Sequence, residues 1–170
     1  MSVLTMAACS SSKTYFTPSI RNAIERGNQS LTKVQFYIDR DIVLKRELET
    51  GETKITSGKV IIENGRTINI VTLKKNTPGV CVLQKKDIIG VSFEAADANF
   101  VTFGKTKFAG ANDPYRVLAN NWIGEEGIVT YEGKQYRILR EGSEASILIK
   151  SKFLKNYKVE EKTLSGRTVN

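Results

Sequence analysis

Residues 59–103 carry the clearest pattern of apolar and polar positions, as short runs of Val, Ile, Thr and Phe separated by Gly, Asn, Pro and Asp. Branched and aromatic side chains suit a pleated, half-buried surface. Asn64 and Gly65 lie between two such runs, and Asn-Gly favours a two-residue hairpin because a type I′ turn needs positive φ at both central positions. Pro78 and Gly79 suit the centre of a type II turn. We therefore predict an antiparallel meander over this stretch.

Other runs of the same kind complete the predicted sheet. They lie at residues 34–38, 42–48, 127–139 and 145–149. The third run is a second hairpin signal, with its turn at Glu132 and Gly133. About nine short strands separated by turn residues are typical of a barrel or a sandwich. We predict an all-β fold, either an antiparallel β-barrel or a β-sandwich, and the pattern leaves the choice between them open.

One short helix is predicted near the N-terminus. Thr17 is a suitable N-cap, Pro18 suits the first helical position, and Gly27 suits the position just past the end. Ile20 and Ile24 are four residues apart and so share one face of this helix. We expect that narrow apolar face to dock on the sheet as a lid.

Cys9 follows a short run of small and apolar residues and precedes three serines. This order resembles the lipobox of a bacterial lipoprotein signal, where the chain is cut before the cysteine and the cysteine becomes the lipidated first residue. Met6 stands where lipoboxes usually have Leu, and the apolar run is short and lacks a basic region before it. We predict residues 1–14 to be a signal remnant and tether, and residues 15–170 a single β-rich domain with a basic C-terminal tail. The alternative is a disordered N-terminus with a free thiol.

The composition is that of an ordinary globular protein, with 40% hydrophobic and 26% charged residues in 170. The net charge of +8 suits nucleic acid, an anionic lipid surface or another acidic polymer, and also a merely solvated lysine-rich surface. Basic residues concentrate from residue 150 onwards. The candidate binding surface there comprises Lys150, Lys152, Lys155, Tyr157, Lys158 and Arg167.

The residue types limit the available chemistry. The chain has no histidine, so it offers no Ser-His or Cys-His nucleophile pair and no His-ligated zinc. Its two cysteines, Cys9 and Cys81, lack metal-ligand spacing. Cys81 lies between two valines, which is typical of a small buried apolar side chain, and a disulfide between the two cysteines is not expected. We predict no metal and no cofactor.

Carboxylate pairs are the remaining catalytic option. The candidates are Asp39 with Asp41, Glu125 with Glu126, and the loop residues Asp97 and Asp113. Glycoside hydrolysis needs two carboxyl groups that face each other across a bond, which adjacency in sequence does not provide. We interpret the first pair as a polar break between strands and the second as a solvated turn. The prediction is that the protein is not an enzyme. Trp122, the single tryptophan, is expected to be a core or rim anchor.

Basic residues also stand next to aromatic ones, as nucleic-acid binding on a sheet face requires. Examples are Lys107 with Phe108, Lys152 with Phe153, and Tyr157 with Lys158. The alternative function is therefore a cytoplasmic β-barrel that binds nucleic acid, with an affinity that falls steeply as salt is added.

Several segments together resemble small envelope lipoproteins of the Bacteroidetes type. These segments are residues 34–37, 41–47, 77–80, 91–94, 129–136 and 164–169. The resemblance runs from about Tyr15 to the end and brings no catalytic residue with it. It implies a lipid-anchored, non-enzymatic accessory component of an envelope assembly, such as a secretion apparatus, that binds a protein partner or an acidic envelope polymer. The lack of an acidic export signal after Cys9 favours the outer membrane, facing the periplasm.

Overall fold

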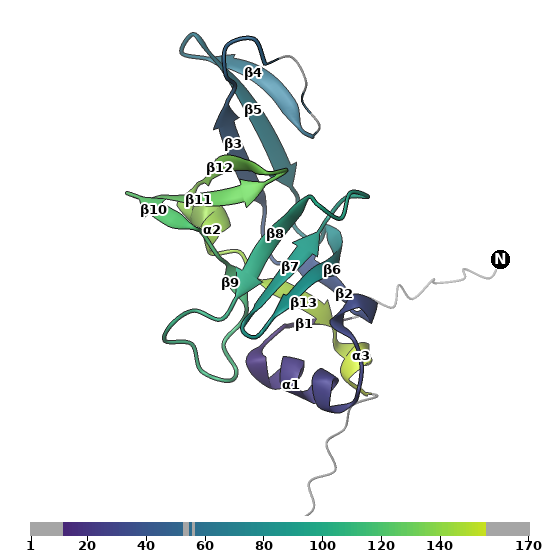
Figure 1. The fold of residues 1–170 in the computed structure, drawn as a ribbon. Helices are drawn as coiled ribbons and strands as arrows, with labels where there is room; N and C mark the ends of the chain where they lie inside the picture. The colour runs from purple at the N-terminus through teal and green to yellow at the C-terminus, as the bar shows by residue number, and fades with distance from the viewer. Residues whose placement is uncertain (1–11, 53–54, 56, 156–170) are drawn as a thin grey trace, which may run out of the picture.

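The computed structural model describes residues 12–52, 55 and 57–155 (Figure 1). Its first sheet, sheet A, consists of β1 (Lys13–Tyr15), β13 (Ile147–Lys150), β2 (Gln35–Ile38), β6 (Pro78–Lys85), β7 (Ile88–Ser92), β8 (Phe100–Gly104) and β9 (Arg116–Val117), in that order. Its second, sheet B, consists of β10 (Asn121–Ile123), β11 (Glu126–Tyr131), β12 (Lys134–Ile138), β3 (Ile42–Glu47), β5 (Arg66–Leu73) and β4 (Lys59–Glu63), in that order. The helices are α1 (Pro18–Arg26), η1 (Leu31–Lys33), α2 (Arg140–Ser143) and α3 (Ser151–Leu154).

The predicted all-β class is confirmed. Every neighbouring pair of strands in both sheets is antiparallel. The arrangement is sandwich-like, and the described strands do not close into a barrel. The structure has more strands than the sequence pattern predicts, because β1, β9 and β10 are two or three residues long. Strands of that length are too short to show an alternating pattern.

Both predicted hairpin turns are confirmed. Asn64 and Gly65 have φ of 52° and 74°, and they join β4 to β5. Glu132 and Gly133 have φ of 52° and 69°, and they join β11 to β12. Positive φ at both central residues gives a turn whose twist matches that of the flanking strands. The two hairpins therefore follow from local sequence alone.

The turn predicted at Pro78 and Gly79 is wrong by a few residues. The chain reverses just before it, where Asn76 has φ of 66° and the Thr77 N–H donates to the Lys74 carbonyl at 3.0 Å. Pro78 is the first residue of β6, a position that proline tolerates in a sheet. Gly79 is required by packing, since a Cβ there would lie 2.6 Å from Cγ1 of Val91.

The predicted single meander over residues 59–103 is also wrong. β4 and β5 form a hairpin in sheet B, whereas β6, β7 and β8 form a meander in sheet A. The chain changes sheets between Leu73 and Pro78. It makes the reverse change at residues 39–41, the predicted polar break, which separates β2 from β3. The alternation of apolar and polar residues along a strand does not specify which other strand that strand pairs with. The sequence pattern therefore did not indicate where the chain passes from one sheet to the other.

The predicted N-terminal helix is confirmed as α1. The Thr17 hydroxyl oxygen accepts from the Ile20 N–H at 3.3 Å, as expected of an N-cap. At the other end the Gly27 N–H donates to the Ala23 carbonyl at 3.1 Å. Ile24 is completely buried and Ile20 packs against the core, so this face of the helix docks as expected.

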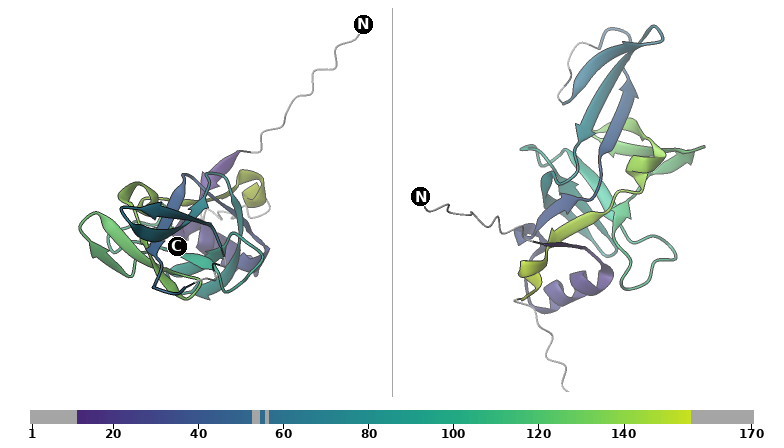
Figure 2. Two further views of the ribbon diagram at one scale, coloured as in Figure 1. Left: turned by 90° about the horizontal axis from the view of Figure 1, so that it is seen from above. Right: turned by 180° about the vertical axis from the view of Figure 1, so that it is seen from behind.

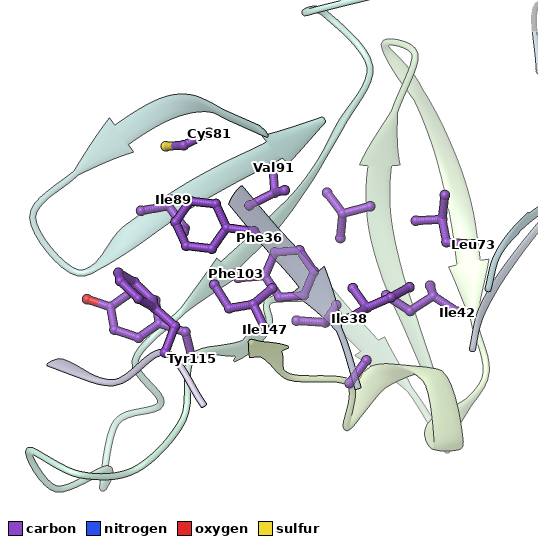
Figure 3. Close-up of a cluster of buried hydrophobic side chains, with 14 of the residues drawn as sticks. Phe36, Ile38, Ile42, Leu73, Cys81, Ile89, Val91, Phe103, Tyr115 and Ile147 are labelled. Atoms are coloured by element: carbon purple, nitrogen blue, oxygen red, sulfur yellow. The ribbon is translucent and has the colours of Figure 1, made fainter. Parts of the chain in front are cut away.

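The core is continuous from sheet A into sheet B (Figure 3). On the side of sheet A, the ring of Phe16 meets Phe36 edge-on at 5.2 Å and Tyr115 at 5.0 Å between ring centroids. Ile38 and Ile42, on either side of the first crossing, are both completely buried and link the two sheets. β3, β4 and β5 project beyond this core at the end of the molecule opposite to α1 (Figures 1 and 2).

Candidate functional site: a groove on the projecting sheet

A groove of about 850 Å³ lies on the outer face of sheet B. Its lining comes mainly from the solvent-facing positions of β3, β5, β11 and β12, with β4 and β10 at the two edges. Successive side chains of a strand point to opposite faces. The same strands therefore supply core residues on one side and groove residues on the other.

Four apolar side chains line the groove. Ile68 of β5 and Ile128 of β11 are half-buried. Ile123 of β10 and Leu139, just after β12, are 57% and 44% exposed. Large apolar side chains gathered in a hollow with polar neighbours are typical of a binding surface.

Three ion pairs lie among these apolar residues. They join Lys45 to Glu63 (3.7 Å), Arg66 to Glu47 (3.1 Å) and Arg137 to Glu126 (3.1 Å). Exposed pairs of this kind contribute only about 0–1 kcal/mol each to stability. Their larger effect is to balance the charge, so the groove presents both signs beside apolar patches and does not concentrate positive charge.

The floor of the groove is supported from the core side by an ion pair. Arg46 donates two hydrogen bonds to Glu52, at 2.7 and 2.8 Å, and their side chains are only 11% and 17% exposed. The hydrogen bonds from Arg46 lower the pKa of Glu52 to about 2, against the opposing effect of burial. The pKa of Arg46 is raised mainly by the same bonds. Both groups are charged near neutral pH, and the pair fixes the loop after β3.

A buried hydrogen-bond network continues from this ion pair. The Tyr136 hydroxyl donates to Oδ1 of Asn69 at 2.7 Å, and Nδ2 of Asn69 donates to the Ser57 carbonyl at 3.0 Å. The Arg46 guanidinium lies over the Tyr136 ring, 5.4 Å from its centroid. These contacts join β3, β5 and β12 to the residues before β4. They tie the strands under the groove floor to one another.

A second polar cluster contains Tyr131 and Glu94. The Tyr131 hydroxyl and the Ser57 hydroxyl both donate to the Glu94 carboxylate, the latter at 3.0 Å. Burial raises the pKa of Tyr131, and the Glu94 carboxylate raises it further. Burial opposes ionisation of Glu94, but the hydrogen bonds from Tyr131, Asn99 and Ser57 outweigh it and lower its pKa. The phenol is therefore a neutral donor and the carboxylate its charged acceptor, an arrangement that anchors the loop after β7.

The described part of the predicted basic surface lies at the opposite end of the molecule. Lys150 is the last residue of β13, Lys152 lies in α3 and Lys155 follows α3. These three lysines are close together because they are near neighbours in the sequence. Tyr157, Lys158 and Arg167, like the predicted lipidation site Cys9, lie outside the described residues. The structure also places Ser12 beside Ser151, which the sequence did not indicate. The Ser151 N–H donates to the Ser12 carbonyl at 2.9 Å.

Tyr37 lies beside Lys150 of this surface and also beside Lys13. The Lys13 ammonium lies 4.6 Å from its ring centroid and that of Lys150 lies 5.9 Å away. Neither lysine forms an ion pair with a carboxylate of the described residues. β1 also straddles the boundary predicted at residue 14, so Lys13 and Thr14 are part of sheet A.

Among the described residues, each candidate carboxylate except the exposed Asp97 has a cationic or backbone partner. The Gly110 N–H donates to Oδ2 of Asp113 at 2.6 Å. Asp39 accepts from the Ser146 N–H at 2.8 Å. Asp41 accepts from Lys74 at 2.9 Å, and this bond is the main cause of its lowered pKa. Glu125 and Glu126 are paired with Arg140 and Arg137. Among the described residues no group of His, Cys, Asp or Glu is arranged to hold a metal ion.

Cys81 lies in the core and Trp122 at the edge of sheet B. Cys81 is 3% exposed in β6, its thiol donates to the Leu83 carbonyl at 3.3 Å, and burial raises its pKa, so the prediction of a buried apolar role is confirmed. Trp122 is 49% exposed on the edge strand β10, which makes it a rim residue.

The groove was missed at the sequence level. The sequence did contain one sign of it, namely charged residues that alternate with core positions in β3 and β12, such as Lys45, Glu47 and Arg137.

No helix formed by the described residues has the length and apolar character needed to cross a membrane. No family model, curated protein or solved structure matches the chain.

Proposed function

We propose that the protein is a non-enzymatic, lipid-anchored accessory component of the cell envelope that binds an extended segment of a protein partner in the groove of sheet B. Cys9 is the proposed anchor, and the outer membrane, facing the periplasm, is the proposed location. The balanced and partly apolar groove is the observation that carries the binding role.

The chemistry of the groove supports a polypeptide as its occupant. An extended segment offers backbone donors and acceptors along its length, and its side chains alternate between two faces. The exposed apolar residues Ile123 and Leu139 can receive apolar side chains, while the ion pairs can exchange partners with charged ones. An acidic polymer would favour a hollow with unpaired cations, whereas Lys45, Arg66 and Arg137 are each paired with a glutamate.

The position of the groove supports a protein that is anchored at one end and binds at the other. β1, which begins four residues after Cys9, lies with α1 and α3 at one end of the molecule. β4 and β5, which border the groove, project from the opposite end (Figure 1). A lipidated Cys9 would thus leave the groove directed away from the membrane. A multiply acylated cysteine anchors a protein stably, whereas a single acyl chain holds it only marginally.

The anchor is tested by fractionating host cells that carry the wild type or Cys9→Ala. We expect the wild type in the membrane fraction and the variant in the soluble fraction, with mass spectrometry finding acyl groups on a peptide that begins at Cys9. Equal retention of both proteins in the membrane fraction contradicts the anchor.

The groove is tested by placing a photoreactive amino acid at Ile123 or Arg137, with Phe108, which is 92% exposed in a loop away from the groove, as the control position. We expect a discrete crosslinked protein from the two groove positions alone, and its loss when Leu139→Asp is added without a change in melting temperature. The same products from Phe108, or none from the groove, contradict the proposal.

A further inference from the structure

We propose that the outer face of sheet A is a second interaction surface, one that docks on an anionic phospholipid membrane. We call it the Tyr37 face, and it consists of Lys13, Tyr15, Tyr37, Pro78, Leu148 and Lys150. The proposal rests on the proposed lipid anchor for its place in the cell, but the face itself can be tested without any lipid on Cys9.

The Tyr37 face has a row of apolar and aromatic residues that crosses four strands. Tyr15 of β1 is opposite Leu148 of β13, Leu148 is opposite Tyr37 of β2, and Tyr37 is opposite Pro78 of β6. Residues directly opposite each other in a sheet point to the same side. Tyr15 is 46% exposed, and Val80, two residues beyond Pro78, is 43% exposed. Sheet A therefore presents this row to solvent on the side opposite to its core.

The charge of the face has one sign. Lys13 and Lys150 are opposite each other in the register of β1 and β13, and both ammonium groups lie beside the Tyr37 ring. β1, β13, β2 and β6 contain no aspartate or glutamate at any position. Lys13 donates to a neutral acceptor, Oδ1 of Asn76, at 3.1 Å. This contrasts with the groove of sheet B, where each lining lysine or arginine has a glutamate partner.

The location of the face favours a membrane over a soluble polyanion. Four residues extend at most about 14 Å, so a lipidated Cys9 would hold Lys13 within that distance of the lipid headgroups. The hydrogen bond between Ser151 and Ser12 places α3, with the exposed Lys152, beside the same strand. Lysines attracted to anionic headgroups, combined with tyrosines whose rings sit at the interface, are the features that bind proteins to membrane surfaces.

The test uses the full chain carrying Cys9→Ala, which cannot be lipidated at that position, and vesicles of phosphatidylcholine with or without phosphatidylglycerol. We expect flotation with the anionic vesicles only, weakened by salt. The Lys13→Gln/Lys150→Gln variant should bind about 25-fold more weakly, because each lysine near an anionic surface strengthens binding about 5-fold. The matched control is Lys59→Gln/Lys107→Gln, which changes the charge equally on β4 and an exposed loop and should bind like the Cys9→Ala parent.

A fluorescence measurement tests whether the tyrosine row contacts the lipid. Trp122 is the only tryptophan, so Trp122→Phe with Tyr15→Trp places the single fluorophore on the Tyr37 face. We expect its emission to shift to the blue when anionic vesicles are added, and no such shift from Trp122 in the Cys9→Ala parent.

Three results would overturn the proposal. They are no binding to anionic vesicles, an equal loss of binding in the two double-lysine variants, and binding of single-stranded oligothymidylate at this face without vesicle binding. The last would assign the face to nucleic acid. Because Cys9 is absent from these experiments, their failure leaves the anchor to the fractionation test, and failure of the anchor leaves these results intact.

Discussion

Tyr136 donates its hydroxyl hydrogen to Oδ1 of Asn69 at 2.7 Å, and both residues are completely buried beneath the groove. The bond joins β12 to β5 even though the two strands are not neighbours in the sheet, since β3 lies between them. It therefore ties β12 to β5 beneath the groove floor.

Removing this hydroxyl should cost more stability than its size suggests. In Tyr136→Phe the buried Asn69 oxygen loses its donor, and an unsatisfied buried acceptor costs about 1–3 kcal/mol. Urea unfolding followed by circular dichroism measures the free energy of unfolding. Tyr37→Phe, at a half-exposed ring, is the matched control, with a change within about 0.5 kcal/mol. Equal effects from the two substitutions would show that the buried bond adds nothing.

The continuous core predicts a large difference between two phenylalanines. Phe36 of β2 is completely buried with Phe16 against its ring, while Phe108 is 92% exposed. Phe36→Ala should lower the free energy of unfolding by about 3–5 kcal/mol, because a cavity replaces the ring. Phe108→Ala should change it by less than about 0.5 kcal/mol. A loss below about 1 kcal/mol for Phe36→Ala would mean that this part of the core is not packed as described.

Gly51 and Gly58 both have a left-handed backbone, but only Gly58 also lacks room for a side chain. Both have φ of 86°, but a Cβ on Gly51 meets no atom of the described residues within 4 Å, whereas one on Gly58 would lie 2.1 Å from the Ile70 carbonyl oxygen. Gly51→Ala should cost about 1–2 kcal/mol for the left-handed backbone alone. Gly58→Ala should cost clearly more in the same urea unfolding assay, because the backbone of β5 must also move. Similar costs at the two positions would argue against this close approach.

Glu52 should stabilise the fold in a pH-dependent way. Its pKa is about 2 when folded, against an ordinary value of 4.5, so the charged carboxylate favours the folded state. That stability is fully present above about pH 4.5 and is lost as the pH falls towards 2. Melting temperatures of the wild type and Glu52→Gln should therefore differ most near neutral pH and converge in acid. A difference that grows as the pH falls from 4.5 to 2 contradicts the ion pair with Arg46.

Local chemistry made the turns and the helix predictable from sequence. A type I′ turn needs two residues of positive φ and nothing beyond its own strands, so Asn64 and Gly65 identified it directly. The N-cap at Thr17 likewise depends only on an oxygen three residues before its donor. Cys81 was recognisable as buried because its valine neighbours mark a strand of the core.

The crossings between sheets could not be predicted in this way. Residues on either side of the turn at residues 74–77 alternate equally well whether β5 and β6 pair with each other or with other strands. β5 pairs with β3 and β4, and β6 with β2 and β7, because those partners bury both sets of apolar residues. Pairing is decided by packing between segments far apart in the chain, which the pattern within one segment does not contain.

The sequence by itself therefore determined the all-β class, the hairpin turns, the capped helix and the residue types available for chemistry. Only the tertiary structure decided which of those residues meet. Strand register places Lys13, Tyr37 and Lys150 together although they come from three separate strands. It also gives the lysines and arginines of the groove their glutamate partners. Periodicity assigns a side chain to a face of its strand, whereas its neighbours on that face are fixed by the packing of the whole chain.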